Sequence, residues 1–471
     1  MEKNSRDKIY IPRILEGKLR KFLSAPEVIV IVGARQVGKT TLMNRLYEGL
    51  PGPKAFLDFE DPELVALFEE DIKAFAQLYV KGKRYLFIDE FQHAEHGGKL
   101  LKYLHDHSDT KFIISGSSSL DLTVSAAYLV GRIFVFELFP LSFAEFLSHK
   151  SPGLLFILNE RIPRGIPISA SLHRQVLSYF EEFSIWGGYP RVVVARDAEE
   201  KAEVLKNIFV TYLLKDVRGF FRLASESGLQ KLVKALALQI GSLIRYSELS
   251  QVSGLRYATL KEYLSILEET YILKLARPFF TNKRLEITKN PKVYFVDTGL
   301  RNYLSQDFRG WSRRTDIGHL IENVIATELM KKEIPLNFWR TKSKGEVDFI
   351  VPTRDHVIPL EVKSGVAKAV GKSFISFIEK YQPLKGYVLH AGLLQEMTVK
   401  GISVQFVPLY GITALDLNPS STVVNLKLPF KGHYRAWEEV LAPRSSFTSR
   451  TDGGIPTLFY STGWVKFERP F

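Results

Sequence analysis

A run of five apolar, β-branched residues, Val28–Val32, leads directly into a glycine-rich turn and then into a segment with helical periodicity. Continuous apolar runs of this kind are typical of strands that are buried on both faces of a parallel sheet. Four more such runs follow at residues 55–59, 85–88, 112–115 and 133–138, and helical stretches separate most of them. This alternation predicts an α/β fold with a parallel sheet in the N-terminal part of the chain.

The turn after the first run has the spacing G-x-x-x-x-G-K-[ST] without departure. Its glycines allow backbone N–H groups to point at phosphate oxygens, and the following helix N-terminus adds positive potential. We expect Lys39 to reach the β- and γ-phosphates and Thr40 to ligate Mg²⁺. The predicted ligands are ATP and Mg²⁺. The predicted nucleotide-binding residues are Gly33, Ala34, Arg35, Gln36, Val37, Gly38, Lys39, Thr40 and Thr41.

An acidic pair, Asp89 and Glu90, follows the apolar run at residues 85–88. Hydrolysis needs one acid in the Mg²⁺ shell and another to orient or deprotonate the attacking water, because a metal-bound carboxylate is a poor base. We assign Asp89 to the metal and Glu90 to the water. Such acidic pairs are common on loops. The glycine-rich turn earlier in the chain strengthens the assignment of this pair to a nucleotide site.

Two further polar features lie near the predicted sheet. Ser115 and Ser117 follow the run at 112–115, where a polar side chain can contact the γ-phosphate or the water; the alternative is a simple capping turn. Arg132 precedes the last run and can stabilise phosphoryl charge in cis or from a neighbouring subunit, which would require a homo-oligomer. Its alternative is a surface arginine or the ion-pair partner of an acid.

The segments GARQVGKTTL, FIDEFQ, ISGSSS, GR followed by FPLSFAEF, and WGGYP together resemble archaeal and bacterial AAA-superfamily ATPases with a C-terminal domain of unknown function. The resemblance covers residues 10–410, and its specific parts are FPLSFAEF and GGYP, since the glycine-rich turn is shared widely. It implies an AAA-type nucleotide-binding domain. It also implies that Arg132 stands at an arginine-finger position and Ser115–Ser117 at a sensor position. The biological role is not defined by it.

The remaining chain divides by its pattern. Residues 141–235 are mainly helical, and residues 236–310 follow the plan helix, turn, helix, β-hairpin of a winged helix. Residues 311–410 alternate helix and strand. We therefore expect a helical segment (1–24), an AAA-type P-loop domain (25–140), a helical lid (141–235), a winged helix (236–310), an α/β restriction-endonuclease-like domain (311–410) and an unassigned tail (411–471).

Basic residues are concentrated in residues 270–314, where ten Lys and Arg face three acids. This excess is more than half of the formal charge of +13 of the chain. Basic side chains interleaved with aromatics suit contact with phosphate backbones, so we expect DNA or RNA as a partner here. The helix Tyr257–Glu269 offers Lys261 for base contact but also carries acids, which favours backbone or shape recognition. A solvated or protein-binding face is the alternative.

Three acids and a lysine near the C-terminal end form a second arrangement: Glu322, Asp348, Glu361 and Lys363. Glu361 and Lys363 share one face of a predicted strand, and Asp348 on a paired strand can meet them. Carboxylates can bind Mg²⁺ while a lysine orients water for attack on a phosphodiester. The pattern resembles the restriction-endonuclease type of fold. It predicts Glu322, Asp348 and Glu361 as metal ligands and Lys363 as catalytic, with an ion-pair cluster in an inactive nuclease fold as the alternative.

Composition removes several classes of protein. The chain has no Cys, which excludes disulfide scaffolds and thiol chemistry, and no apolar stretch of about 20 residues that could span a bilayer. We expect a cytoplasmic protein without membrane contact. The first hypothesis is an ATP-hydrolysing switch coupled to a nucleic-acid-facing winged helix and a nuclease-like module. The second is a nucleotide-gated adaptor with an inactive nuclease fold and a protein-binding winged helix; a small-molecule phosphotransferase ranks last.

Overall fold

The computed structural model describes residues 9–116, 129, 131–211, 226–280, 286, 289–341, 343–353, 356–417, 458–460 and 463–465. Two units separate along the chain, Met1–Leu426 and Lys427–Phe471. The described part of the second unit is an antiparallel strand pair, β15 (Leu458–Tyr460) and β16 (Gly463–Val465). The first unit contains every predicted site.

The N-terminal sheet has five parallel strands in the order β2-β3-β4-β1-β5. Their bounds are β1 (Val28–Val32), β2 (Lys54–Asp58), β3 (Tyr85–Asp89), β4 (Lys111–Gly116) and β5 (Ile133–Glu137). The three central strands β3, β4 and β1 are buried along their whole length. This agrees with the apolar runs that these strands contain, and the predicted parallel α/β domain is confirmed.

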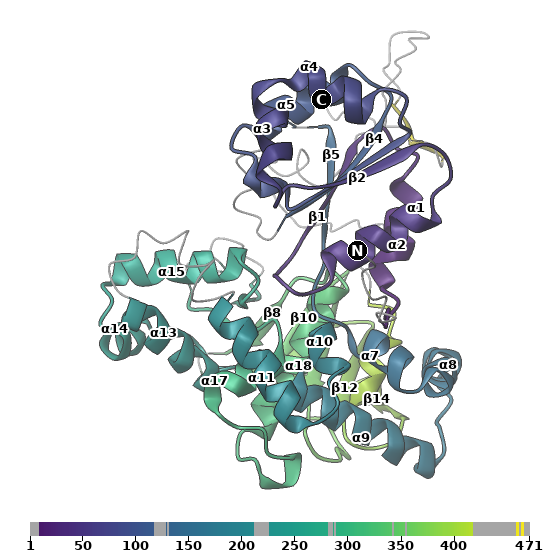
Figure 1. Cartoon of the computed structure of the whole chain (residues 1–471). Coiled ribbons are helices and arrows are strands. Elements are labelled where there is room, and N and C mark those ends of the chain that lie inside the picture. The colour runs from purple at the N-terminus through teal and green to yellow at the C-terminus, as the bar shows by residue number, and fades with distance from the viewer. Residues whose placement is uncertain are drawn as a thin grey trace, which may run out of the picture. The chain divides into compact units, whose positions relative to one another are not determined.

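Helices cover both faces of this sheet, with α2 and α1 on one side and α3, α4 and α5 on the other (Figure 1). Their bounds are α1 (Ile14–Phe22), α2 (Lys39–Gly49), α3 (Pro62–Glu70), α4 (Ile72–Phe75) and α5 (Gly97–Asp106), with a π-helical turn at Ala76–Val80 and a 3₁₀ turn at Phe91–His93. Local signals start α3: Asp61 caps it by accepting a hydrogen bond from the N–H of Glu63, and Pro62 takes the first helical position.

A helical segment follows β5. It comprises α7 (Phe143–Lys150), α8 (Pro152–Arg161), a 3₁₀ turn (Ile162–Arg164), α9 (Ala170–Trp186), α10 (Pro190–Val193) and α11 (Ala198–Ile208). Ser142 and Glu145 begin α7 with a capping box, in which each side chain accepts the backbone N–H of the other residue. Gly187 ends α9, and its N–H donates to the carbonyl of Phe183. The predicted helical character of residues 141–235 therefore holds in the described part of that range.

Three helices and two strands come next: α13 (Glu226–Leu238), α14 (Tyr246–Ser253), α15 (Tyr257–Glu269), β6 (Leu273–Pro278) and β7 (Lys292–Phe295). The strands β6 and β7 are antiparallel. On its other side β6 pairs in parallel with β8 (Asn337–Arg340), which pairs with β9 (Glu346–Val347), so one sheet has the order β7-β6-β8-β9. The predicted boundary at residue 310 therefore falls inside a sheet.

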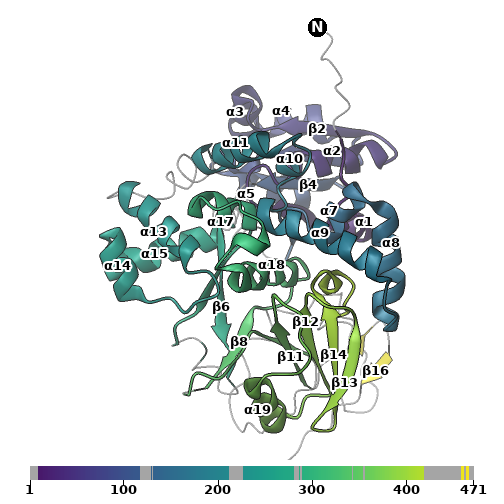
Figure 2. The same ribbon diagram turned by 90° about the horizontal axis from the view of Figure 1, so that it is seen from below.

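The C-terminal sheet has the order β10-β11-β12-β14-β13, and its strands lie side by side in Figure 2. Its strands are β10 (Phe349–Pro352), β11 (Val357–Val362), β12 (Lys385–His390), β13 (Gln395–Val399) and β14 (Ile402–Pro408). The helices of this part are α17 (Thr298–Ser305), α18 (Ile317–Lys331) and α19 (Lys372–Tyr381), with 3₁₀ turns at Trp311–Arg313 and Leu409–Thr413. The central β11, β12 and β14 are parallel, and both edge strands are antiparallel.

The hairpin β13–β14 was not among the predicted elements. Its two-residue loop, Lys400 and Gly401, has positive φ at both positions, as expected for the tight turns that match strand twist. Within the described part of the chain, none of the helices combines the length and the apolar character that crossing a bilayer requires.

Candidate nucleotide-binding site and C-terminal acidic cluster

The glycine-rich loop, residues 33–40, connects the carboxyl end of β1 to the first turn of α2. Gly33 has a φ of 154°, and a Cβ there would lie 2.2 Å from the carbonyl oxygen of Leu138. Gly38 has a φ of 97°, and Gln36 is also in the left-handed region with a φ of 62°. These conformations explain why the glycines of the motif cannot be replaced without strain.

Lys39 is 4% exposed and lies inside the loop. Its Nζ donates hydrogen bonds to the carbonyl oxygens of Gly33 (2.9 Å) and Ala34 (3.1 Å). Burial lowers the pKa of Lys39 to about 8, although Glu90 and Asp89 oppose the shift. Thr40 and Thr41, by contrast, are exposed at the start of α2. The ammonium is thus held on two carbonyl groups that a phosphate group can replace.

The acidic pair lies at the carboxyl end of β3, beside β4. Asp89 is 2% exposed, and the hydroxyl of Ser115 donates a hydrogen bond to its Oδ1. The N–H of Glu90 donates to the Ser115 Oγ at 3.2 Å. The side chain of Gln92 donates to Glu90 Oε2, and Glu90 itself has a φ of 51°. Ser115 therefore positions both acids, a contact that the sequence did not reveal. Ser117 lies outside the described residues.

Arg132 lies at the opposite edge of the sheet from the glycine-rich loop. It precedes β5, whose Ile133 pairs with Val28 at the start of β1, whereas the loop follows the far end of β1. Five strand residues separate the two edges by about 16 Å. The Arg132 Nε donates to Asp106 at 2.9 Å, and the side chain is 37% exposed. Arg132 is therefore distant from the loop of its own chain and pairs with an acid at the surface, as the alternative of an ion-pair partner describes.

Arg13 is a residue of the site that the sequence analysis missed. It is 8% exposed, and its guanidinium donates to the Val37 carbonyl of the loop (2.7 Å), the Phe139 carbonyl (2.5 Å) and Glu145 Oε1 (3.2 Å). Glu145 belongs to the FPLSFAEF segment and also accepts the N–H of Ser142 at 2.8 Å. The S-x-x-E spacing of Ser142 and Glu145 was visible in the sequence, but nothing in the sequence indicated that Glu145 also pairs with Arg13.

The GGYP segment packs against the same connection. A Cβ on Gly188 would lie 2.2 Å from the carbonyl oxygen of Leu141. The two backbones also hydrogen-bond, because the N–H of Leu141 donates to the Gly188 carbonyl at 2.7 Å. Asp297, just before α17, accepts the N–H of Gly188 at 2.7 Å. The glycine is therefore required by the close approach of the chain after α9 to the segments that precede α7 and α17.

The predicted C-terminal cluster is brought together in part. Asp348 Oδ2 accepts the N–H of Val362 at 2.8 Å, and Lys363 Nζ donates to Glu361 Oε1 at 2.7 Å. Burial, with repulsion from Glu322 and Glu361, raises the pKa of Asp348 well above its usual value. Burial likewise raises the pKa of Glu361. These acids and Lys363 thus share one electrostatic environment, as the strand spacing predicted.

Glu322 on α18 has a different partner from the one expected. Lys292 Nζ lies 2.8 Å from Glu322 Oε1 and 2.5 Å from Glu346 Oε1. Across the described residues, no three His, Cys, Asp or Glu side chains are grouped so that they could hold a metal ion. In this arrangement Glu322 pairs with the ammonium group of Lys292, which was not part of the predicted set of Glu322, Asp348 and Glu361.

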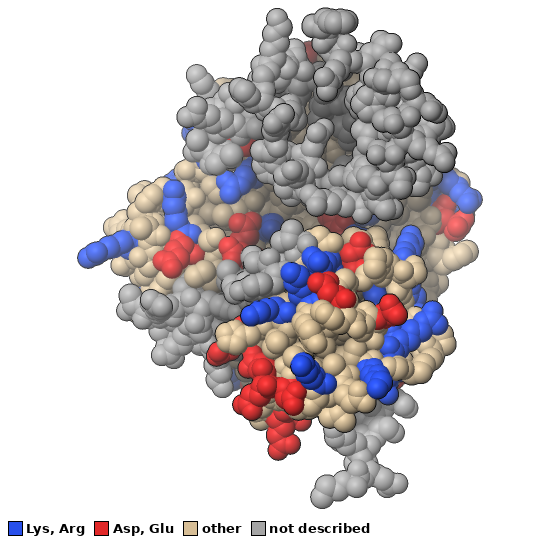
Figure 3. Space-filling model, turned by 90° about the horizontal axis from the view of Figure 1, so that it is seen from above, with Lys and Arg blue, Asp and Glu red and all other residues tan. Residues whose placement is uncertain are grey.

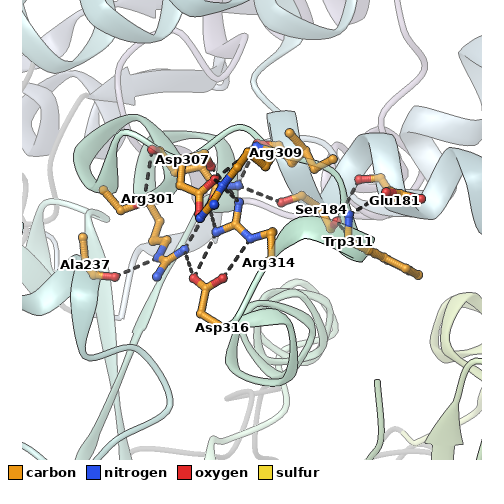
Figure 4. A network of polar contacts seen from close by, with 12 residues as sticks. Glu181, Ser184, Ala237, Arg301, Asp307, Arg309, Trp311, Arg314 and Asp316 are labelled. Atoms are coloured by element: carbon orange, nitrogen blue, oxygen red, sulfur yellow. Dashed lines mark hydrogen bonds and ion pairs between the residues drawn. The ribbon is translucent and has the colours of Figure 1, made fainter. Parts of the chain in front are cut away.

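Three basic residues of the 270–314 segment, Lys292, Arg301 and Arg314, are buried inside the protein, and Lys283 and Arg284 lie outside the described residues. Arg301 and Arg314 are 2% and 6% exposed and both pair with Asp316, at 2.7 and 2.9 Å (Figure 4). Arg301 Nε also donates to the Ala237 carbonyl of α13 at 2.7 Å, and Arg314 Nη1 donates to the Asp307 carbonyl at 2.6 Å. This network joins α13 to α17 and to the start of α18, so these cations cannot contact phosphate.

Two more of these cations have acidic partners at the surface: Arg309 pairs with Asp307 at 2.9 Å, and Lys274 lies 3.7 Å from Glu268. Arg277, Lys289 and Arg313 are exposed. On the face in Figure 3, basic and acidic side chains are interspersed over the described surface. The net charge of the segment therefore overstates the basic surface that it presents, because a charge count does not register burial.

Comparison with known proteins divides the chain into three matched parts. Residues 25–147 match an AAA domain family, and residues 177–310 and 317–410 match two domains of unknown function (DUF8612 and DUF4143). Uncharacterized proteins of Haemophilus influenzae and Methanocaldococcus jannaschii are each 25% identical to the chain. The matches cover 75% and 85% of this chain and 85% and 88% of those proteins, respectively.

Two solved structures align with lower similarity. The Walker-type ATPase of Pyrococcus abyssi is 16% identical, with a TM-score of 0.43, and the match covers 64% of this chain and 98% of that one. A RuvB variant of Thermotoga maritima is 20% identical, with a TM-score of 0.30, and the match covers 58% and 94%. The parallel sheet and the loop geometry agree with the match of residues 25–147 to an AAA domain: the N-terminal part of this chain has a P-loop ATPase-like fold.

Proposed function

We propose that the chain binds ATP with Mg²⁺ and hydrolyses it. The observation that carries the proposal is the arrangement of Lys39, Asp89, Glu90 and Ser115 at the carboxyl edge of strands β1, β3 and β4. Parallel α/β sheets bind ligands at this edge. A cation, a buried carboxylate and a half-buried carboxylate there match the needs of phosphoryl transfer to water.

Each residue has a role in this proposal. The Thr40 hydroxyl and the Asp89 carboxylate are oxygen ligands of the type that Mg²⁺ prefers, and the bound ion would neutralise phosphate charge. Lys39 exchanges its two carbonyl partners for phosphate oxygens. Glu90, whose orientation is fixed by Gln92, accepts the proton of the attacking water. The loop N–H groups between Gly33 and Thr41 cradle the phosphates.

The test is ATP turnover by the purified full-length chain with Mg²⁺. Lys39→Ala is expected to lose nucleotide binding, and Glu90→Gln is expected to bind ATP but to hydrolyse it about 10²–10⁴-fold more slowly. Lys99→Ala and Glu95→Gln change exposed residues of the same types and serve as matched controls. If Lys39→Ala hydrolyses ATP as fast as the unmodified chain, the proposal fails.

We also propose that nucleotide binding is coupled to the C-terminal part of the chain. Arg13 holds the loop carbonyl of Val37 and Glu145 at the start of α7. The N–H of Phe143, in the first turn of α7, donates to Glu328 of α18 at 3.1 Å. A displacement of the loop by ATP would therefore reach α18 through three groups that are all buried. Hydrogen exchange of α18 with and without ATP would detect this coupling.

A nucleic-acid-facing winged helix is the finer part of this proposal. The order α13, α14, α15 and the antiparallel β6–β7 pair supports it, as do exposed Arg256 and Lys261 at the start of α15. Alanine at both positions is expected to lower the salt dependence of duplex binding by about one unit per lost phosphate contact. Alanine at Arg164, which is exposed on another element, provides the control.

The second candidate, a nucleotide-gated adaptor with an inactive nuclease fold, is favoured by a specific observation. Lys292 occupies the acidic cluster, and Arg301 and Arg314 are buried in ion pairs. An adaptor is expected to capture a protein partner only in one nucleotide state, with slow turnover. Duplex binding with a steep salt slope would argue against it, since phosphate contacts release counterions.

Arg132 is proposed to act in a neighbouring subunit of a homo-oligomer. Its exposed position at the amino edge of β5 supports this role over one in its own chain. In a mixture of inactive Lys39→Ala chains with Arg132→Ala chains, an oligomer is expected to recover activity because each supplies what the other lacks. No recovery, together with a monomeric mass, would contradict the assignment.

A further inference from the structure

A buried lysine lies within the C-terminal acidic cluster, although it comes from another part of the chain. Lys292 begins β7, is 1% exposed, and contacts carboxylates on α18 and β9. Burying an ammonium group is costly unless carboxylates pair with it. Burial by itself would lower the pKa of Lys292, but attraction to Glu322, Asp348 and Glu346 raises it above its usual value. The Lys292 ammonium therefore lies within ion-pair distance of carboxylates from both α18 and β9.

The backbone of β7 holds Lys292 in this place. The amide side chain of Asn323, next to Glu322, makes two hydrogen bonds with the backbone of Phe295, at 2.9 and 2.7 Å. Lys292 and Tyr294 lie on the same face of the strand because alternate residues do so. The Tyr294 hydroxyl accordingly donates to the same Glu322 oxygen at 2.5 Å. The ammonium is thus tethered at a defined position.

Each of the surrounding acids already has donors from the protein. Glu346 accepts a hydrogen bond from Arg340 at 3.1 Å in addition to its contact with Lys292. Asp348 accepts a backbone N–H, and Glu361 accepts Lys363. Glu361 Oε2 is buried without a hydrogen-bond partner. Protein groups thus already occupy at least one oxygen of each acid around Lys292.

We propose that Lys292 is a tethered cation that takes the place of a divalent metal ion among Glu322, Glu346 and Asp348. The cluster is then a structural ion-pair centre that joins the β6–β7 hairpin to the C-terminal sheet. It has no nuclease activity while β7 is in place. This inference does not depend on ATP hydrolysis, because no residue of the glycine-rich loop takes part in it.

The test measures Mn²⁺ binding to the nucleotide-free full-length chain by electron paramagnetic resonance. Thr40→Ala is included in every sample so that the loop cannot contribute a metal site. With Lys292 present, we expect no Mn²⁺ to bind at the cluster. With Lys292→Met, the freed carboxylates are expected to bind about one Mn²⁺ ion per chain. Lys289→Met, which removes an exposed lysine from the same region, is the control and should resemble the chain with Lys292 intact.

Two results would overturn the proposal. One is a Mn²⁺ ion bound while Lys292 is present and lost in Asp348→Asn. The other is a folded Lys292→Met protein that binds none. If Lys292→Met does not fold, a triple variant that also carries Glu322→Gln and Glu346→Gln tests the proposal. The two glutamine side chains are neutral and need no cation beside them, so the triple variant is expected to regain the thermal stability that the single variant lacks. A triple variant as unstable as the single one would show that Lys292 acts by packing.

Discussion

Arg13 provides the most direct test of how the nucleotide loop is held. Its guanidinium makes three hydrogen bonds, and the side chains of the Arg13–Glu145 pair are 6% and 7% exposed. Removing one partner of a buried ion pair costs about 3–5 kcal/mol of unfolding free energy. Glu145 keeps the N–H groups of Ile14 (2.7 Å) and Ser142 (2.8 Å) in Arg13→Ala. We therefore expect Arg13→Ala to lose about 3 kcal/mol of unfolding free energy, the lower end of this range.

The same substitution is expected to weaken ATP binding. The Val37 carbonyl loses its anchor, so the loop must be ordered by the nucleotide itself. A cost of about 1.4 kcal/mol would raise the Kd for ATP about tenfold. Urea unfolding and equilibrium titration with a fluorescent ATP analogue measure the two effects on the same protein.

Arg20→Ala is the matched control, since Arg20 lies in helix α1, which Arg13 directly precedes, and pairs with Glu16 at the surface. Exposed pairs four residues apart contribute about 0.3–0.5 kcal/mol. If Arg13→Ala and Arg20→Ala unfold at the same urea concentration and bind ATP equally, the reasoning from burial is refuted.

Three further outcomes are expected. Lys39 of the nucleotide-free protein has a pKa of about 8 and loses its proton above that pH, whereas Lys39 in contact with phosphate keeps it. The affinity for ATP should therefore fall about tenfold per pH unit above pH 8. Calorimetric titration of Lys39→Arg should show no such decline if this reasoning holds. Gly188→Ala should cost about 1–3 kcal/mol in urea unfolding, because its Cβ would lie 2.2 Å from the Leu141 carbonyl oxygen; an unchanged midpoint would contradict the close packing. Burial lowers the pKa of His390, so the native state binds fewer protons than the unfolded chain. Stability should therefore decline as the pH falls below about 6.5, and the decline should be shallower in His390→Asn.

Local patterns accounted for much of the fold. The run Val28–Val32, its glycine-rich turn and the helix after it are contiguous in sequence, and β1, the loop and α2 follow that order. The helix Tyr257–Glu269 has its predicted bounds, since its apolar spacing is internal to the segment. The β13–β14 hairpin was missed although Lys400 and Gly401 carry a recognisable turn signal.

The acidic cluster was predictable only in part. Glu361 and Lys363 are two residues apart on one strand, so their common face follows from strand geometry. Glu322 and Lys292 are 30 residues apart and lie on different elements, and nothing in the spacing joins them. The ten basic residues of the 270–314 segment looked alike in the sequence, but burial separates Lys292, Arg301 and Arg314 from the other basic residues that the structure describes there.

The amino-acid order was sufficient for the nucleotide loop, the parallel sheet around it and the acidic pair, because each depends on neighbouring residues and on strand or helix periodicity. Tertiary packing decided which charged residues pair with one another. Arg13 reaches Glu145 across 132 residues, and Lys292 reaches Glu322 through the docking of β7 on α18. Charged groups that lose their water on burial must be paired, because an unpaired buried charge is costly, and burial is a property of the assembled fold.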